Sequence, residues 1–196
     1  GLGDVYKRQI KNNPDVIVIV DEAYIDFGGE TALPLIDKYD NLVVVRTFSK
    51  SRSMAGLRIG YAISNSELIK ALNDVKYSYN SYTMNRPSLV LGVESIHDDA
   101  YFREKVGQII ATRERFVKEI AELGFTCLPS SANFVFATHE SIPAKEIFAA
   151  AKENNIYVRY FDKPRIDNYL RISIGTDAEM DAFVAFLKGY VETKQN

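Results

Sequence analysis

The chain has 196 residues, 46% of them hydrophobic and 26% charged, and a net charge of −2 at pH 7; these values are typical of a globular protein with one good core or two small ones. The charge balance and the scattered basic residues argue against nucleic-acid binding. One cysteine, Cys127, excludes an internal disulfide and a cysteine metal cluster, and no apolar run approaches the roughly 20 residues of a membrane span. We therefore expect a cytoplasmic protein with no metal site and with Cys127 as a buried structural thiol.

Two apolar runs organise the first part of the chain. Residues 16–20 predict a buried strand that ends on Asp21, and Leu42 to Val45 predict the next one. About two helical turns fit between them, over residues 32–39, so the three segments predict a right-handed crossover unit. Parallel strands joined in this way end at one edge of the sheet, where open α/β sheets bind ligands. Asp21 and Lys50 follow those two ends and should stand at the same edge.

The middle of the chain changes from strand to helix. Residues 59–63 predict a third strand, and a capped helix is predicted over residues 68–75. The aromatic segment 77–87 has no clean period and predicts a loop, whose tyrosines either line a pocket or cover the edge of a core. From Ser88 to Leu123, apolar residues recur at three- and four-residue spacing. This pattern predicts a helical connection with a break at His97–Asp99.

The last third predicts a separate α+β unit with helices on one face of a small sheet. Three short β-rich runs lie at 133–137, 156–160 and 169–174. Pro143 sits in the first turn of a helix, and Thr176–Glu179 is a capping box that opens the final helix. Residues 1–9 show no clear period, and we interpret them as a foreign leader. The chain is thus expected to divide into that leader, a partial large domain over 10–98, and a connecting helix with a small domain over 99–196.

Three short motifs stand at the predicted strand ends. They read D-E-A-Y at 21–24, T-F-S-K at 47–50 and G-L-R-I-G-Y at 56–61. Together they resemble the fold-type I aminotransferases, which use pyridoxal phosphate, and among these most closely the histidinol-phosphate aminotransferase family. The resemblance runs from about Ile10 to the C-terminus. It implies an α/β fold: part of a three-layer large domain with a mostly parallel sheet, followed by a small α+β domain. It also implies a longer, homodimeric chain in which roughly half of the large domain comes first.

The resemblance assigns a role toward pyridoxal phosphate to each motif residue. Lys50 would form the Schiff base and move the substrate proton, Asp21 would face the pyridine nitrogen, and Tyr24 would donate to the phenolic oxygen. The cofactor phosphate would be held by Thr47, Ser49 and Arg58. Taken singly, the same residues have plainer explanations, such as a solvated lysine, a turn-capping aspartate or a tyrosine packed in a core. Glu22 is expected to be structural.

The substrate residues implied by the resemblance lie in the small domain. They are Arg171, Arg159 and Asn133. Two guanidiniums suit the phosphate dianion of histidinol phosphate, the substrate that would exchange its amino group with the glutamate/2-oxoglutarate pair in histidine biosynthesis. Arg159 is equally explained as a surface residue of an edge strand, and Asn133 as a strand-end cap. Three alternatives stay open: an aromatic or other amino-acid aminotransferase, a phosphothreonine-type decarboxylase of the same fold, and a non-catalytic folding or dimerisation remnant.

Overall fold

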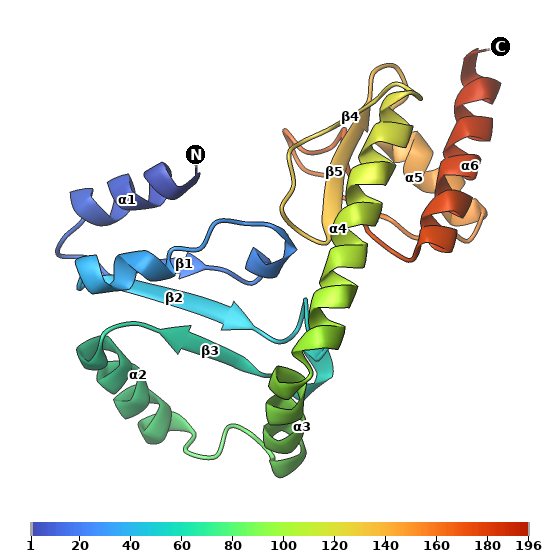
Figure 1. Cartoon of the computed structure of the whole chain (residues 1–196). Helices are drawn as coiled ribbons and strands as arrows, with labels where there is room; N and C mark the ends of the chain where they lie inside the picture. The colour runs from blue at the N-terminus through green and yellow to red at the C-terminus, as the bar shows by residue number, and fades with distance from the viewer. Residues whose placement is uncertain (1, 196) are drawn as a thin grey trace. The chain divides into compact units, whose positions relative to one another are not determined.

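The computed structural model describes residues 2–195 and divides into two compact units, Gly1–Glu104 and Lys105–Asn196. The sequence predicted a domain boundary between residues 98 and 99, whereas the two units of the structure meet a few residues later, between Glu104 and Lys105, inside a helix. The first unit contains α1 (Leu2–Asn12), β1 (Val18–Asp21), the 3-10 helices η1 (Ile25–Phe27) and η2 (Leu33–Lys38), β2 (Leu42–Thr47), η3 (Ala55–Leu57), β3 (Gly60–Ile63), α2 (Ser66–Tyr79), α3 (Arg86–His97) and the start of α4 (Asp99–Ala121) (Figure 1).

A three-stranded sheet in the order β1-β2-β3 forms the centre of the first unit. β1 and β2 are parallel, with Val18 opposite Leu42, which confirms the parallel pairing expected of the two apolar runs. β3 is antiparallel to β2 and forms an outer strand. The core on one face joins α1, β1, η2 and β2 through Ile10, Val20, Ala32, Leu35, Leu42 and Val44.

The N-terminal segment differs from the sequence-based expectation. Residues 1–9 show no clear period, yet Leu2–Asn12 form α1. Tyr6 and Ile10, four residues apart, pack against the core of the first unit, and Ile10 is fully buried. One such pair is too short a repeat to reveal a helix from sequence. That this segment is foreign to the protein stays a prediction.

The aromatic segment after β3 is also more helical than its sequence indicates. α2 begins at an N-cap in which the Asn65 side chain accepts from Leu68 N at 2.9 Å, as the cap pattern predicted. It continues to Tyr79, and α3 begins at Arg86. The prediction of a loop over 77–87 was therefore wrong at both ends. The predicted break between α3 and α4 is confirmed at Asp98.

A buried ion pair joins Glu22, which directly follows β1, to Arg46 of β2. The Glu22 side chain accepts hydrogen bonds from the Thr31 hydroxyl at 2.9 Å and from Nε and Nη2 of Arg46 at 3.0 and 2.8 Å. Burial alone would lower the pKa of Arg46, but the hydrogen bond with Glu22, the charge of Glu22 and the nearby Tyr61 together raise it above its usual value. Glu22 is 5% exposed, so its expected structural role is confirmed.

Replacing Glu22 by alanine is expected to lower the free energy of unfolding by about 3 kcal/mol, because removing one partner of a buried pair leaves the other charge uncompensated. Arg46, at 21% side-chain exposure, can recover some hydration, which favours the lower end of the usual range. Denaturant unfolding followed by circular dichroism measures the change. The exposed Glu30 provides the matched control, Glu30→Ala. Equal losses in the two variants would contradict the role of the pair.

The second unit is an antiparallel sheet with helices on one face. Besides the rest of α4, it contains β4 (Phe125–Cys127), β5 (Phe134–His139), α5 (Ala144–Glu153), β6 (Arg159–Tyr160), β7 (Leu170–Ser173) and α6 (Asp177–Gln195), with the strands in the order β4-β5-β7-β6. Alternate strand residues, such as Val135 and Ile172, pack with Phe116 of α4, Ile147 of α5 and Leu187 of α6. The predicted α+β unit is present, with one more strand, β4, than the sequence analysis gave.

Local signals in the second unit are realised as expected. At the capping box, Glu179 N donates to Thr176 Oγ1 at 3.3 Å and Thr176 N donates to Glu179 Oε2 at 2.7 Å.

Cys127 is half-buried rather than fully buried, and burial raises the pKa of its thiol to about 11. Among residues 2–195, every helix is either too short or too polar to span a lipid bilayer.

Candidate active site

Asp21 and Thr47 lie on one face of the first sheet. Asp21 is the last residue of β1 and pairs in register with Val45 of β2. Thr47 lies two residues beyond Val45, and side chains two apart on a strand share a face. Asp21 is exposed, and its Oδ1 accepts a hydrogen bond from Ala23 N at 2.9 Å. The carboxylate is therefore fixed by the turn that follows its strand.

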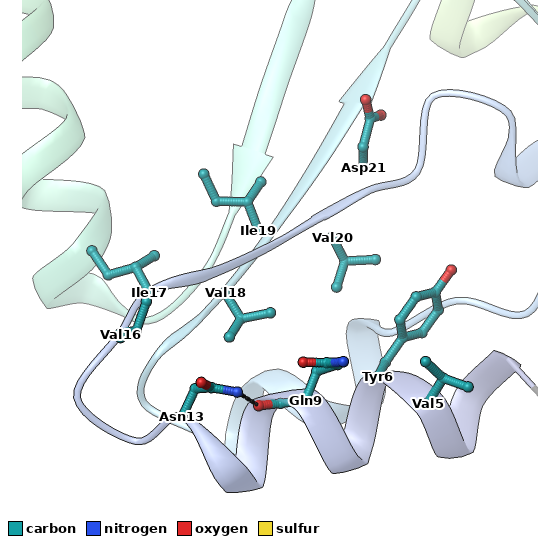
Figure 2. Close-up of a pocket in the computed structure, with 10 residues that line it drawn as sticks. All are labelled: Val5, Tyr6, Gln9, Asn13, Val16, Ile17, Val18, Ile19, Val20 and Asp21. Atoms are coloured by element: carbon teal, nitrogen blue, oxygen red, sulfur yellow. Dashed lines mark hydrogen bonds between the residues drawn. The ribbon is translucent and has the colours of Figure 1, made fainter. Parts of the chain in front are cut away.

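Figure 2 shows how β1 distributes its side chains. Val18 and Val20 point toward α1, whereas Ile17, Ile19 and Asp21 point away from it. The hollow drawn there follows the outer edge of β1, and Asp21 is the one charged side chain among its ten lining residues. This hollow is thus mainly apolar, and the polar groups of interest lie at and beyond its Asp21 end.

Lys50 and Tyr24 meet just past the ends of the parallel strands. The Lys50 Nζ lies 5.3 Å from the centroid of the Tyr24 ring, within the range of a cation–π contact. Lys50 itself is exposed, and its carbonyl accepts from Ser53 N at 3.1 Å in a tight turn. Two of the residues singled out in different motifs, 26 positions apart in the chain, are thereby brought together.

The backbone brings the three predicted phosphate-binding residues together. Thr47 Oγ1 donates to the Ile59 carbonyl at 3.2 Å and accepts from Ser49 N at 3.0 Å. Ser49 and Ile59 lie at the two ends of the loop that carries Lys50 and Arg58, so the Thr47 hydroxyl is hydrogen-bonded to both ends of this loop. Arg58 has the left-handed φ of 57°, a conformation that costs a non-glycine residue roughly 1–2 kcal/mol. Its Nη1 donates to the Ala55 carbonyl at 2.9 Å, so the guanidinium folds back on its own loop.

Arg171 and Arg159 form a pair in the second unit. They are register partners on β7 and β6, so their side chains share a face, the one opposite the helices. Arg171 Cζ lies 5.4 Å from the Phe134 ring centroid, and Arg159 Cζ 5.4 Å from that of Phe161. Among the described side chains, Arg171 Nε is buried without a hydrogen-bond acceptor. Such a donor costs about 1–3 kcal/mol, which an anionic ligand would offset.

Asn133 stands immediately before β5 and is half-buried. Its carbonyl accepts from Ile174 N at 2.9 Å and so extends the pairing of β5 with β7. The observed contact is thus that of a strand-end residue, and a role toward substrate stays a prediction for its side chain.

Several side-chain contacts in each of the two units were not predicted by the motifs. Ser51 Oγ donates to Asp26, and Arg52 contacts residues of α3 and α4. His139, to which the sequence assigned nothing, is buried, with Nδ1 accepting from Ser141 N at 3.1 Å and Nε2 donating to the Leu123 carbonyl at 2.9 Å. The bonds of Ser51, Arg52 and His139 Nε2 join residues at least 16 positions apart, so spacing in the sequence carries no signal for them. The described residues hold no cluster of three His, Cys, Asp or Glu side chains suited to a metal ion.

Comparison with known families identifies one match over nearly the whole chain. Residues 7–187 match the model of the family described as aminotransferase class I and II. Histidinol-phosphate aminotransferase 2 of Dechloromonas aromatica is 50% identical over 185 residues, which are 94% of this chain and 52% of that protein. The histidinol-phosphate aminotransferase of Brachyspira hyodysenteriae is 51% identical over 186 residues, again 94% and 52%. The chain spans about half the length of the curated relatives it matches.

Solved structures share the fold. The histidinol-phosphate aminotransferase of Clostridium acetobutylicum superposes with a TM-score of 0.87 at 25% identity, covering 96% of this chain and 58% of that one. That of Sinorhizobium meliloti, determined in complex with pyridoxal 5′-phosphate, gives 0.78 at 27% identity, covering 92% and 50%. The expected fold, part of a fold-type I aminotransferase, is confirmed.

Proposed function

The chain belongs to the aminotransferase class I and II family, and on this premise we propose that it forms the lysine-bearing part of a histidinol-phosphate aminotransferase. The longer enzyme would exchange an amino group between histidinol phosphate and 2-oxoglutarate, giving imidazole acetol phosphate and glutamate. The names of relatives at about 50% identity support this substrate. The observation that carries the proposal is the Lys50 amine, exposed beyond the ends of two parallel strands and 5.3 Å from the Tyr24 ring centroid.

The residues at the strand ends suit pyridoxal phosphate as the cofactor. When bound, it supplies the electron-accepting ring that the reaction needs. Lys50 would hold the cofactor covalently, and Asp21 would pair with its ring nitrogen. The hydroxyls of Thr47 and Ser49 would bind its phosphate together with the guanidinium of Arg58. The chain thus supplies an amine for the aldehyde, a carboxylate to accept from the ring nitrogen, and two hydroxyls and a guanidinium to donate to the phosphate.

Lys50, Tyr24 and Asp21 would each have a separate role in the reaction. Lys50 Nζ, in its neutral form, would take up the proton that leaves the substrate carbon and return it to the neighbouring position. Tyr24, whose ring lies beside this amine, would orient it and donate its hydroxyl proton in a hydrogen bond to the cofactor. Asp21, fixed by Ala23 N, would keep its charge directed at the ring nitrogen. The homodimer and the cytoplasmic location stay predictions.

Substrate recognition falls to the arginine pair in this proposal. Histidinol phosphate has no α-carboxylate, so its phosphate dianion is the group that an arginine pair would bind. Arg171 presents a buried Nε that lacks an acceptor, and Arg159 is its neighbour in register. Two guanidiniums on one face of a sheet, next to aromatic rings, match a compact dianion better than a single negative charge. Asn133 would lie close to the same substrate.

The Arg171→Ala variant tests this assignment in a hybrid enzyme, in which residues 10–196 replace the matching part of the Dechloromonas aromatica relative. Loss of a charge-assisted contact in a desolvated site should cost about 2–5 kcal/mol of binding, on the order of 30-fold or more. We expect the KM for histidinol phosphate to rise by that factor, while the KM for histidinol changes little. Steady-state kinetics with both substrates measures the difference.

Arg165→Ala, in an exposed loop of the same unit, is the matched control and should leave both constants unchanged. An equal rise of KM for histidinol phosphate and histidinol in Arg171→Ala would contradict the phosphate assignment. Turnover of aromatic amino acids in preference to histidinol phosphate, or release of carbon dioxide in place of glutamate, would support the alternative aminotransferase or decarboxylase instead.

A further inference from the structure

One face of α3 supports the loop that carries Lys50. Ser88, Gly92 and Ser95 are spaced four and three residues apart and so share that face. The Ser88 hydroxyl donates to the Leu57 carbonyl at 2.9 Å. A Cβ added to Gly92 would come within 2.9 Å of the Ile59 side chain, which shows how closely the helix approaches. The small residues of α3 thus let the helix lie directly against the loop.

Arg52 makes the third contact between α3 and the loop, and it also reaches α4. Its Nη1 donates to the Ser95 carbonyl and lies 3.4 Å from the Ser95 hydroxyl. Its Cζ lies 4.1 Å from the ring centroid of Phe102 in α4 and 5.5 Å from that of Phe48. The half-buried guanidinium therefore joins the loop to the end of α3 and to the start of α4.

The opposite side of the loop is fixed by the neighbouring residue. Ser51 is buried, and its hydroxyl donates to Asp26 in η1, two residues after Tyr24. The two residues that follow Lys50 consequently anchor its backbone in two directions, toward η1 and toward α3. Lys50 is exposed, and within residues 2–195 the Tyr24 ring is the one group in contact with its amine. The position of that amine therefore depends on the backbone on which it is carried.

We propose that Arg52 is a positioning residue for Lys50. By stacking on Phe102 and donating to Ser95, it fixes the loop so that the Lys50 amine stays beside Tyr24. The inference rests on the proposed role of Lys50. Arginine suits this position because a planar guanidinium can stack on a ring and donate in its own plane at once, whereas lysine offers only a point charge. Loosening the loop would move the amine, and a misplacement of about 1 Å can cost on the order of 100-fold in rate.

The test compares Arg52→Met and Arg52→Lys with the parent hybrid enzyme. We expect kcat per bound cofactor to fall about 100-fold in Arg52→Met, with KM for histidinol phosphate changed less than about threefold. Arg52→Lys should recover only part of the loss. Hydrogen exchange in the cofactor-free protein should become faster over residues 49–57 in Arg52→Met and remain unchanged in α6. The pH profile of the bound cofactor's absorbance should also shift, a change that lower stability alone would not produce.

Arg86→Met is the matched control, since Arg86 is an exposed arginine at the start of α3. Where Arg52→Met does not fold, Phe102→Leu removes the stacking ring and keeps the hydrogen bond, and it should show a smaller fall in kcat together with faster exchange over residues 49–57. Parental kcat per bound cofactor, pH profile and exchange rates in a folded Arg52 or Phe102 variant would overturn the inference. Failure of the proposed function would show differently, as cofactor absorbance and turnover that persist in Lys50→Ala.

Discussion

Replacing Lys50 by alanine in the hybrid enzyme is expected to abolish both the absorbance of the covalently held cofactor and transamination. The amine is the proposed point of attachment and the proposed carrier of the substrate proton, and no other lysine lies within the T-F-S-K loop. Removal of a residue with two such roles should lower kcat by about 10⁴-fold or more. Absorbance titration with pyridoxal phosphate and single-turnover kinetics with histidinol phosphate measure the two losses.

Lys76 offers a closely matched control for this experiment. It is also an exposed lysine whose Nζ lies near a tyrosine ring, 5.2 Å from the centroid of Tyr77, but it lies within α2 rather than after a strand. Lys76→Ala should retain parental absorbance and turnover. Persisting absorbance and turnover in Lys50→Ala would rule Lys50 out, and equal losses in the two variants would point to a general loss of folded protein.

Sequence patterns were sufficient where the determining interactions are local. The continuous apolar runs 16–20 and 42–45 do form parallel strands, as such runs indicate. In this chain β1 is covered on one face only, with Val20 buried and Ile19 64% exposed. The capping box at Thr176 acts within one helical turn, so four residues specify it completely. The predicted position of Asp21 and Lys50 at one sheet edge follows from the parallel pairing of the two strands, whereas the contact of Lys50 with Tyr24 also depends on the turn after β1.

Sequence patterns were insufficient where residues distant in the chain determine the local structure or a side-chain contact. The last turn of α2 is exposed on every side through Tyr79, so no apolar stripe marks it as helical. β4 has only three residues and is specified by its pairing with β5, with Phe125 opposite His139. Arg52 looks like a solvated loop residue in the sequence, and its partners in α3 and α4, Ser95 and Phe102, lie more than 40 positions away in the chain. These features depend on tertiary contacts, which a linear pattern does not record.

Large apolar side chains lie exposed on the first unit. Every residue of α2 from Ala71 to Tyr79 is exposed. On α3, the residues away from the Lys50 loop are exposed and apolar: Leu89, Val90, Val93 and Ile96. Ile19 of β1, on the same face as Asp21, is 64% exposed. Apolar surface of this extent marks a protein interface or an aggregation site.

The unpaired strands add to this surface. β1 and β3 are the outer strands of the first sheet, and within residues 2–195 neither pairs with a further strand. Open edges of this kind accept strands from other chains. Because the chain also spans about half the length of its curated relatives, part of the family fold lies outside its 196 residues. An aminotransferase site that needs those other residues is incomplete here.

The 196-residue chain by itself is therefore expected to bind pyridoxal phosphate weakly, to show no transaminase turnover and to self-associate. It carries the amine, the carboxylate and part of the phosphate-binding loop, but catalysis depends on groups that act together, and loss of the remaining ones should cost at least about 10³-fold in rate. Absorbance titration, a glutamate-release assay and sedimentation velocity on the purified chain measure the three properties, with the hybrid enzyme as the positive control. Measurable transamination by the purified chain, free of any longer enzyme, would show that residues 10–196 already contain a complete site. In that case the exposed faces of α2, α3 and β1 would have to be covered by a second copy of the chain, which the sedimentation data would reveal as an active dimer.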